Sequence, residues 1–184
     1  ASLADINVNL IQPALYRIGK NWQQNVISVS QEHTSAEIAK SMIVRGLGSS
    51  VGASNGKKIV LACVQDNHHD IGLQMVRVAF LNAGWNVKYF GANSPTPQLV
   101  ESLLESRPDL VGLSVAMPNQ FISAAEIVAE VREKLATPFS VIIGGIAVGS
   151  YPTVAEKIGA NFLCFDAQSA VDYADSLQIP KTIH

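Results

Sequence analysis

The sequence has few cysteines and few charged residues, and the patterns that would point to several classes of protein are missing. Only two of its 184 residues are cysteines. They do not form a C-x-x-C pair, so neither zinc coordination nor dithiol redox chemistry is indicated. Cys63 and Cys164 lie instead in apolar, strand-like runs. A cysteine in such a run is typically a small core residue of a protein from a reducing compartment.

Basic and long apolar segments are also absent. Charged residues make up 15% of the chain, the net charge is −2, and the 13 Lys and Arg residues are scattered. A protein that binds nucleic acid by itself normally has a basic face, so we expect no direct nucleic-acid binding. No apolar run is long enough to span a bilayer, and the N-terminus does not resemble a signal peptide. We therefore expect a cytoplasmic protein without a membrane partner.

From residue 58 onward, apolar strands alternate with amphipathic helices. This alternation predicts an α/β domain over 57–184, with a five-stranded parallel, flavodoxin-like (Rossmann-like) sheet in the order 2-1-3-4-5. Thr96 and Pro97 are expected as N-cap and first residue of the second helix. The expected strands are 58–64, 86–90, 109–115, 139–143 and 161–165, and the expected helices include 71–83, 152–158 and 167–176.

The first 50 residues predict a short all-α region. A first helix is indicated by apolar residues at helical spacing, namely Leu10, Ile11, Leu15, Ile18 and Trp22. The β-branched residues within 26–30 disfavour a continuous helix. Ser28 and Gln31 have the spacing of a capping box, so a second helix is expected from there to about Gly46. We expect a helical unit over 1–50 and a linker over 51–56.

A turn with two adjacent histidines, residues 64–72, follows the first strand of the expected sheet. Open α/β sheets bind ligands beyond the carboxyl ends of their strands, at the point where the strand order reverses. In the order 2-1-3-4-5 that point lies between the first and third strands. We therefore expect a ligand site between the histidine turn and residues 114–117.

The histidine turn resembles the D-x-H-x-x-G signature of cobalamin (vitamin B12)-binding Rossmann-like domains, with His69 as its histidine and Gly72 as its glycine. Two further segments match in order, Ser114-Val115-Ala116 to an S-x-L segment and Gly144-Gly145 to a G-G pair. The resemblance implies that His69 is the lower axial cobalt ligand. It also implies that Ser114 offers a hydroxyl to the nucleotide tail and that the glycines let the tail approach the backbone. The implied cofactor-binding residues of this domain are Asn67, His69, Asp70, Ile71, Gly72, Ser114, Ala116, Met117, Gly144, Gly145, Asp166 and Ala167.

The turn departs from the signature at Asn67, where the family usually has Asp. The signature carboxylate hydrogen-bonds the histidine ring. An uncharged Asn can also accept that bond, but it should make His69 a weaker donor to cobalt. A rival alignment pairs His68 with Asp66, but it puts an isoleucine at the glycine position, so His69 is preferred. The plain alternative is an exposed polar loop with incidental histidines.

The helical region adds a second resemblance. Trp22, nine further residues and then Glu32-His33 resemble the W-x9-E-H motif of light-responsive B12 photoreceptors, which use a helical cap over the upper corrin face. The resemblance implies that Trp22 packs at the upper axial group, with Glu32 and His33 nearby and His33 as a candidate upper ligand after photolysis. On one unbroken helix Trp22 and His33 would lie about 16 Å apart, so the predicted break is needed to bring them together. Trp22 alone would otherwise be read as a core aromatic residue.

This resemblance implies a sensor that binds adenosylcobalamin, with methylcobalamin and hydroxocobalamin as alternatives, and that has no catalytic residue of its own. Two helices are fewer than the family's four-helix cap, so either the natural chain begins earlier or another chain completes the cap. The expected partners are a second copy of the chain or a separate regulatory protein. A corrinoid carrier of a methyltransferase system is the alternative function. A relative that binds haem, or that works with a bilin-binding domain, is a third interpretation.

Overall fold

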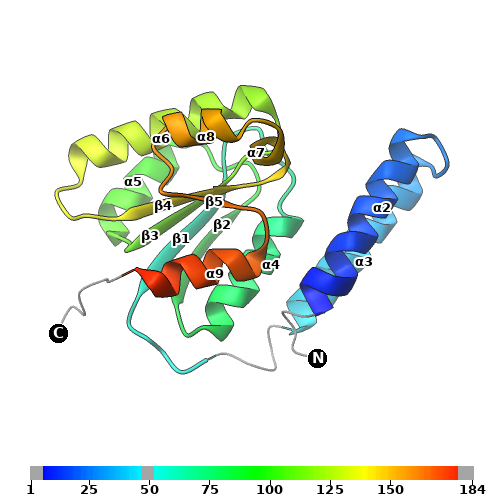
Figure 1. Cartoon of the computed structure of the whole chain (residues 1–184), viewed down its shortest axis with the longest axis horizontal. Helices are drawn as coiled ribbons and strands as arrows, with labels where there is room; N and C mark the ends of the chain where they lie inside the picture. The colour runs from blue at the N-terminus through cyan, green and yellow to red at the C-terminus, as the bar shows by residue number, and fades with distance from the viewer. Residues whose placement is uncertain (1–5, 47–51, 178–184) are drawn as a thin grey trace.

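The computed structural model describes residues 6–46 and 52–177, and its centre is a five-stranded parallel sheet in the order β2-β1-β3-β4-β5 (Figure 1). The predicted fold class and strand order are confirmed. The strands are β1 (Lys58–Cys63), β2 (Asn86–Gly91), β3 (Leu110–Ser114), β4 (Ser140–Gly144) and β5 (Phe162–Cys164). The register pairs Cys63 with Ser114 and Ser114 with Gly144. The ends of the three central strands therefore lie side by side, and the loops that follow them share one edge.

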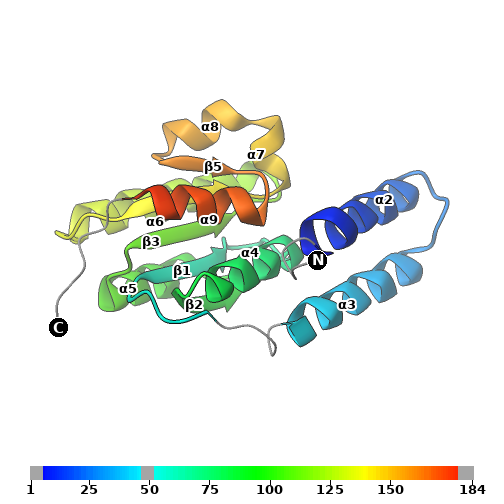
Figure 2. The ribbon, with the colours of Figure 1, turned by 60° about the horizontal axis from the view of Figure 1, so that its bottom comes forward.

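Helices cover both faces of the sheet (Figure 2). Along β1, Ile59 and Leu61 contribute to the core that includes α4 and α9, while Val60 and Ala62 contribute to the core on the opposite face. This period of two is what a strand buried on both sides requires. The helices of this domain are α4 (Ile71–Asn82), α5 (Thr96–Ser106), η3 (Pro118–Gln120), α6 (Phe121–Lys134), α7 (Ile146–Ser150), α8 (Pro152–Lys157) and α9 (Ala167–Ser176).

Two local predictions in this domain need correction. Helix α5 has Pro95 as its N-cap and Thr96 as its first residue, and the hydroxyl of Thr96 is buried without a hydrogen-bond partner instead of capping the helix. Pro95 precedes the helix with extended backbone angles, which suit a residue outside the first turn. Helix α7, immediately after Gly145, was not predicted, because five residues are too few to show a helical period.

The N-terminal residues form a pair of helices joined by a short turn. A π-helical segment η1 (Asn7–Ile11) leads into α2 (Gln12–Gln23), and α3 (Val29–Gly46) follows. The predicted break between helices is confirmed. So is the capping box, in which Ser28 Oγ accepts from the Gln31 N–H at 3.2 Å and Gln31 Oε1 accepts from the Ser28 N–H at 2.9 Å. The expected end of this region and the start of the linker, residues 47–51, lie outside the described residues.

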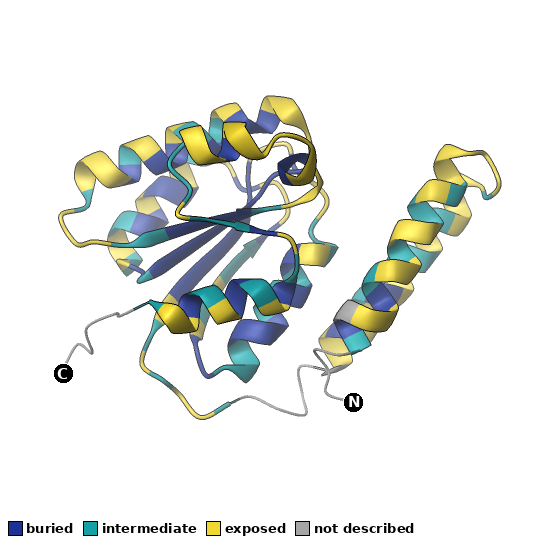
Figure 3. Cartoon of the chain, in the orientation of Figure 1, coloured by how far each residue is buried: buried dark blue, intermediate teal, exposed yellow. Residues whose placement is uncertain are grey.

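The helical pair buries little of its surface. No residue of α2 is buried, and Leu10, one of the apolar residues at helical spacing that predicted the first helix, is 60% exposed. Figure 3 shows the pair as mostly exposed or intermediate, in contrast to the buried strands. In Figure 1 the pair stands beside the edge of the domain at which α4 begins. None of the helices in the described ranges combines the length and the apolar character needed to cross a membrane.

Candidate functional site

Asn67 ties the histidine turn to the end of β3. Its side chain is fully buried, and its Nδ2 donates to the Ser114 carbonyl at 2.8 Å and to Ser114 Oγ at 3.3 Å. Its Oδ1 accepts from the backbone N–H of His69 at 3.0 Å. The structure does not show the hydrogen bond that we expected from the imidazole ring to Asn67, and the amide oxygen accepts from the backbone of His69 instead. Asn67 shapes the turn and does not orient the ring.

The turn presents His69 at the surface. His68 and His69 are both exposed, and within the described ranges neither ring makes a hydrogen bond. Gly72 is exposed in the first turn of α4, and a Cβ atom built on it would meet nothing within 4 Å. Open space therefore lies in front of the segment that carries the predicted ligand.

Asp70 connects the histidine turn to the helical pair. Its Oδ2 accepts from Gln74 Nε2 at 2.8 Å and from the Tyr89 hydroxyl at 3.3 Å, and its Oδ1 lies 3.3 Å from Lys40 Nζ on α3. Burial, together with the Asp70 carboxylate, raises the pKa of Tyr89. Burial lowers the pKa of Lys40, but the carboxylates of Asp70 and Glu37 outweigh it, so that pKa is raised. The residue next to His69 thus contacts α3, α4 and β2 together.

Two polar residues in neighbouring loops support the same turn, although the sequence analysis did not single them out. Asn93, after β2, accepts from the Asp66 N–H at 2.8 Å through Oδ1. Gln120, at the end of η3, donates from Nε2 to the Asp66 carbonyl at 2.9 Å. Their position in the sequence could have pointed to them, because both residues follow strands that end at the same edge of the sheet as β1.

The glycine pair after β4 has a structural role that the resemblance did not imply. A Cβ on Gly144 would lie 3.0 Å from the Cys164 carbonyl oxygen. Gly145 has φ +107°, and its Cβ would lie 2.3 Å from the Val115 carbonyl oxygen. Only glycine adopts this backbone without strain. Gly145 is therefore required by the backbone and by its packing, and Gly144 packs closely against the end of β5, whatever ligand lies beyond them.

Asp166 and Ala167 also have contacts within the protein. Asp166 is the N-cap of α9, where its Oδ1 accepts from the Ser169 N–H at 2.7 Å, and Ala167 is buried in the core beneath that helix. Cys164 Sγ donates to the Asp166 carbonyl at 2.9 Å. Burial raises the pKa of Cys164 to about 11 and that of Cys63 to about 12. The prediction that both cysteines are buried is confirmed, and neither thiol ionises readily.

Large apolar side chains are exposed along the edge where the strands end. Met117 after β3, Ile146 after β4 and Phe165 after β5 are 50%, 62% and 61% exposed. No three His, Cys, Asp or Glu side chains within 6–46 and 52–177 form a group that could hold a bare metal ion. Without such a group, an exposed histidine at the same edge of the sheet as these apolar side chains suits a metal that carries its own equatorial ligands in a broad, partly apolar macrocycle. The residues present fit a corrinoid.

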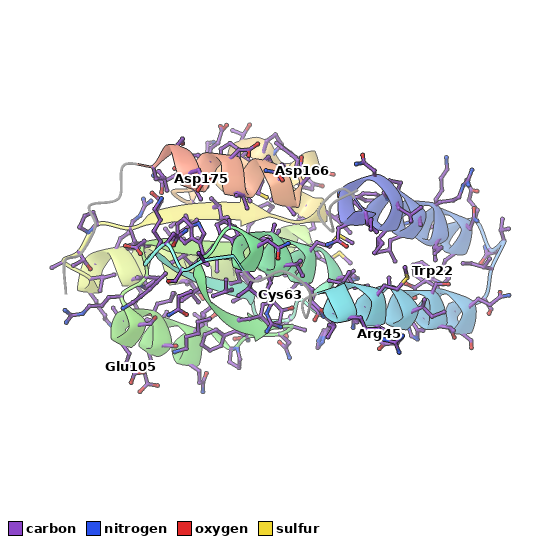
Figure 4. All side chains as sticks on the ribbon, turned by 90° about the horizontal axis from the view of Figure 1, so that it is seen from below. Trp22, Arg45, Cys63, Glu105, Asp166 and Asp175 are labelled. Atoms are coloured by element: carbon purple, nitrogen blue, oxygen red, sulfur yellow. The ribbon has the colours of Figure 1, made fainter. Side chains whose placement is uncertain are left out.

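The helical pair brings its three predicted residues to one end. Trp22 lies in the last turn of α2, and Glu32 and His33 lie near the start of α3, so all three are at the end of the hairpin that carries its turn. His33 Nε2 lies 3.6 Å from Glu32 Oε2, the His33 side chain is 74% exposed, and Trp22 is 43% exposed. Figure 4 shows Trp22 on the helical pair, apart from Cys63 in the sheet domain. In the part of the chain that the structure describes, no hydrogen bond joins these residues to the turn of His69.

One model of the B12 binding domain matches residues 57–172, and a second model of the B12 binding domain matches residues 1–44. The chain belongs to the B12-binding domain family. The resemblance drawn from the histidine turn and the helical motif is confirmed, and the chain is a cobalamin-binding domain.

Relatives of this B12-binding domain include regulators and corrinoid proteins. The chain is 26% identical over 152 residues to the HTH-type transcriptional repressor CarH of Myxococcus xanthus, covering 83% of this chain and 50% of that protein. It spans about half the length of that repressor and of the related CarA, of which it covers 47%. A corrinoid protein of Desulfitobacterium hafniense is 28% identical over 182 residues, covering 92% and 82% of the two chains. The monomethylamine corrinoid protein of Methanosarcina barkeri shares the fold, with a TM-score of 0.81 at 18% identity over 95% and 83% of the two chains.

Proposed function

We propose that this B12-binding domain is the sensory part of a light-responsive regulator and that it binds adenosylcobalamin between the sheet edge and the helical pair. The observation that carries the proposal is the placement of Trp22, Glu32 and His33 at one exposed end of the α2–α3 hairpin. The residues of a W-x9-E-H motif can contact the same ligand only if the chain reverses between the tryptophan and the Glu-His pair. The break between α2 and α3 provides that reversal. The similarity to the repressors CarH and CarA supports the same function.

In this proposal each half of the protein has its own task. His69 would supply an imidazole nitrogen to cobalt, and the exposed side chains of Met117, Ile146 and Phe165 would cover apolar parts of the macrocycle. Trp22 would pack against the adenosyl group and so report whether that group is present. Bound adenosylcobalamin supplies a cobalt–carbon bond that light can break. A change in the contacts of Trp22 then shifts the helical pair between two arrangements. The protein itself acts as a switch and not as an enzyme.

The test is to load the protein with adenosylcobalamin and to record its absorption spectrum and oligomeric state before and after green light. We expect a spectral change together with a change in assembly or in the mobility of the helical pair. Trp22→Ala should weaken the response to light while cobalamin remains bound. Tyr16→Ala, which removes another exposed aromatic side chain from α2, should leave the response intact. A loaded protein whose spectrum and assembly ignore light would refute the sensor function.

A corrinoid carrier is the second candidate, and it has an observation of its own in its favour. The chain covers 82% of the Desulfitobacterium corrinoid protein and 75% of a dimethylamine corrinoid protein of Methanosarcina acetivorans, against half of the repressor. A carrier would donate a cobalt-bound methyl group to an acceptor in the presence of a methyltransferase. Loss of methyl groups from methylcobalamin-loaded protein only when enzyme and acceptor are present would favour the carrier.

A further inference from the structure

The backbone of Asp66 is held on both sides by side chains from other loops. Asp66 has φ +64°, in the left-handed region that L-residues other than Asn and Asp rarely adopt. Its N–H donates to Asn93 Oδ1 at 2.8 Å, and its carbonyl accepts from Gln120 Nε2 at 2.9 Å. Three residues before His69, the chain therefore adopts a conformation that Asp tolerates, and side chains from two other loops hold it in place.

Each supporting residue is anchored in its own loop. Gln120 is only 4% exposed, and its Oε1 accepts from the N–H groups of Ala116 at 2.9 Å and Met117 at 3.0 Å. Asn93 has φ +49°, and its N–H donates to the Asn67 carbonyl at 2.7 Å. The two carboxamides thus join the loops after β2 and β3 to the start of the histidine turn.

We propose that Asn93 and Gln120 are positioning residues that set the place of His69 for ligation to cobalt, which rests on the proposed role of His69. Downstream, Asn67 is held by Ser114 and α4 begins at Ile71, so the course of the turn depends on where it starts. Fixing the peptide of Asp66 fixes that start. Residues that orient a metal ligand from behind change metal affinity by about 10- to 100-fold when they are replaced.

The test uses pairs of variants that separate the hydrogen bond from the backbone conformation. Asn93→Gly keeps the positive φ but removes the acceptor, whereas Asn93→Asp keeps both the acceptor and a residue that tolerates this φ. Gln120→Glu keeps an acceptor for the two N–H groups of the β3 loop but loses the donor to Asp66. His69→Ala is the reference for loss of ligation, and thermal melts report on folding.

The readout is the axial nitrogen bound to cobalt in the cob(II)alamin-loaded protein produced with nitrogen-15-labelled histidine. In its electron paramagnetic resonance spectrum a labelled histidine nitrogen splits the lines into doublets, whereas the unlabelled benzimidazole nitrogen of the corrinoid splits them into triplets. Corrinoid retention on gel filtration is measured separately. We expect Asn93→Gly and Gln120→Glu to lower the equilibrium constant for histidine ligation by about tenfold or more, and Asn93→Asp to stay within about twofold of the unmodified protein. The corrinoid should remain bound in all three.

The outcomes distinguish the positioning role from the proposed function. A full histidine doublet in both Asn93→Gly and Gln120→Glu, with the doublet lost in His69→Ala, would overturn the positioning role alone. A histidine doublet that survives in His69→Ala would overturn the assignment of His69 and the positioning role with it. If one variant fails to fold, the other still decides the question, because the two act on different atoms of Asp66.

Discussion

Replacing Asn67 with Asp restores the first residue of the D-x-H-x-x-G signature that the histidine turn resembles, yet the geometry predicts a loss of stability. The side chain of Asn67 is fully buried, and its Nδ2 is the donor to the carbonyl oxygen of Ser114 at 2.8 Å. In the Asn67→Asp variant a carboxylate oxygen would take the place of that donor and would face the carbonyl oxygen directly. The other oxygen would still accept from the His69 N–H, as Oδ1 does now.

The size of the effect follows from the groups that lose a partner. The variant loses the group that donates to both the Ser114 carbonyl and Ser114 Oγ, and it leaves a buried carboxylate oxygen against the carbonyl oxygen. Leaving such a group unsatisfied costs about 1–3 kcal/mol if it is neutral and more if it is charged. The Ser114 carbonyl keeps a bond from the Val64 N–H at 3.2 Å, which limits the loss. We therefore expect the free energy of unfolding to fall by about 3 kcal/mol. For a chain of this size that lowers the melting temperature by roughly 6–12 °C.

The assay is chemical unfolding at neutral pH of the cobalamin-free protein, followed by circular dichroism. Asn86→Asp is the matched control, since Asn86 is exposed at the start of β2 and the same exchange of amide for carboxylate should cost little. Equal stability of the two variants, or a gain in stability from Asn67→Asp, would refute the role assigned to the Asn67 amide.

Three further predictions concern backbone, charge and pH. Gly145→Ala should lower the free energy of unfolding by about 3 kcal/mol or more, because it combines a positive φ with a steric clash, and chemical unfolding measures this loss. Gly72→Ala should fold normally but retain less cobalamin on gel filtration, because its methyl group fills open space at the start of α4. Lys40→Gln should lower the free energy of unfolding by less than about 1 kcal/mol but speed hydrogen exchange in the helical pair, because it removes the ion pair with Asp70. Lys134→Gln breaks an exposed ion pair on α6 and should leave hydrogen exchange in the helical pair unchanged. The pKa of Cys63 is about 12 in the folded protein against 9.0 for an ordinary thiol. The unfolded chain therefore releases the thiol proton first, so the contribution of Cys63 to the free energy of unfolding is complete below pH 9 and is lost as the pH rises above it. Between pH 8 and 10 this effect should lower the free energy of unfolding of the unmodified protein by about 1.4 kcal/mol. Cys63→Ala should not show this part of the pH-dependent loss when both proteins are followed by chemical unfolding.

The sequence alone was enough for the features that depend on local spacing. Alternating apolar runs and amphipathic segments predicted the sheet, its strand order and the helix over 167–176, because period and connection length constrain an α/β domain strongly. The capping box at Ser28 and Gln31 marked the start of α3, since both of its hydrogen bonds lie within four residues. The histidine turn and the Trp22 motif were recognisable for the same reason, as short patterns in contiguous or evenly spaced residues.

The detailed structure of the site was decided by contacts between residues far apart in the chain. Asn67 meets Ser114 across 47 positions, and Asp66 meets Gln120 across 54. The Asn67 amide was therefore assigned to the imidazole, and the support from Gln120 was not foreseen. A polar residue carries no local sign of its partner, because its hydrogen bonds depend on which loops the sheet register places together. The sheet register aligns Cys63, Ser114 and Gly144 at one edge, and only this alignment brings the loops together that hold the histidine turn in place.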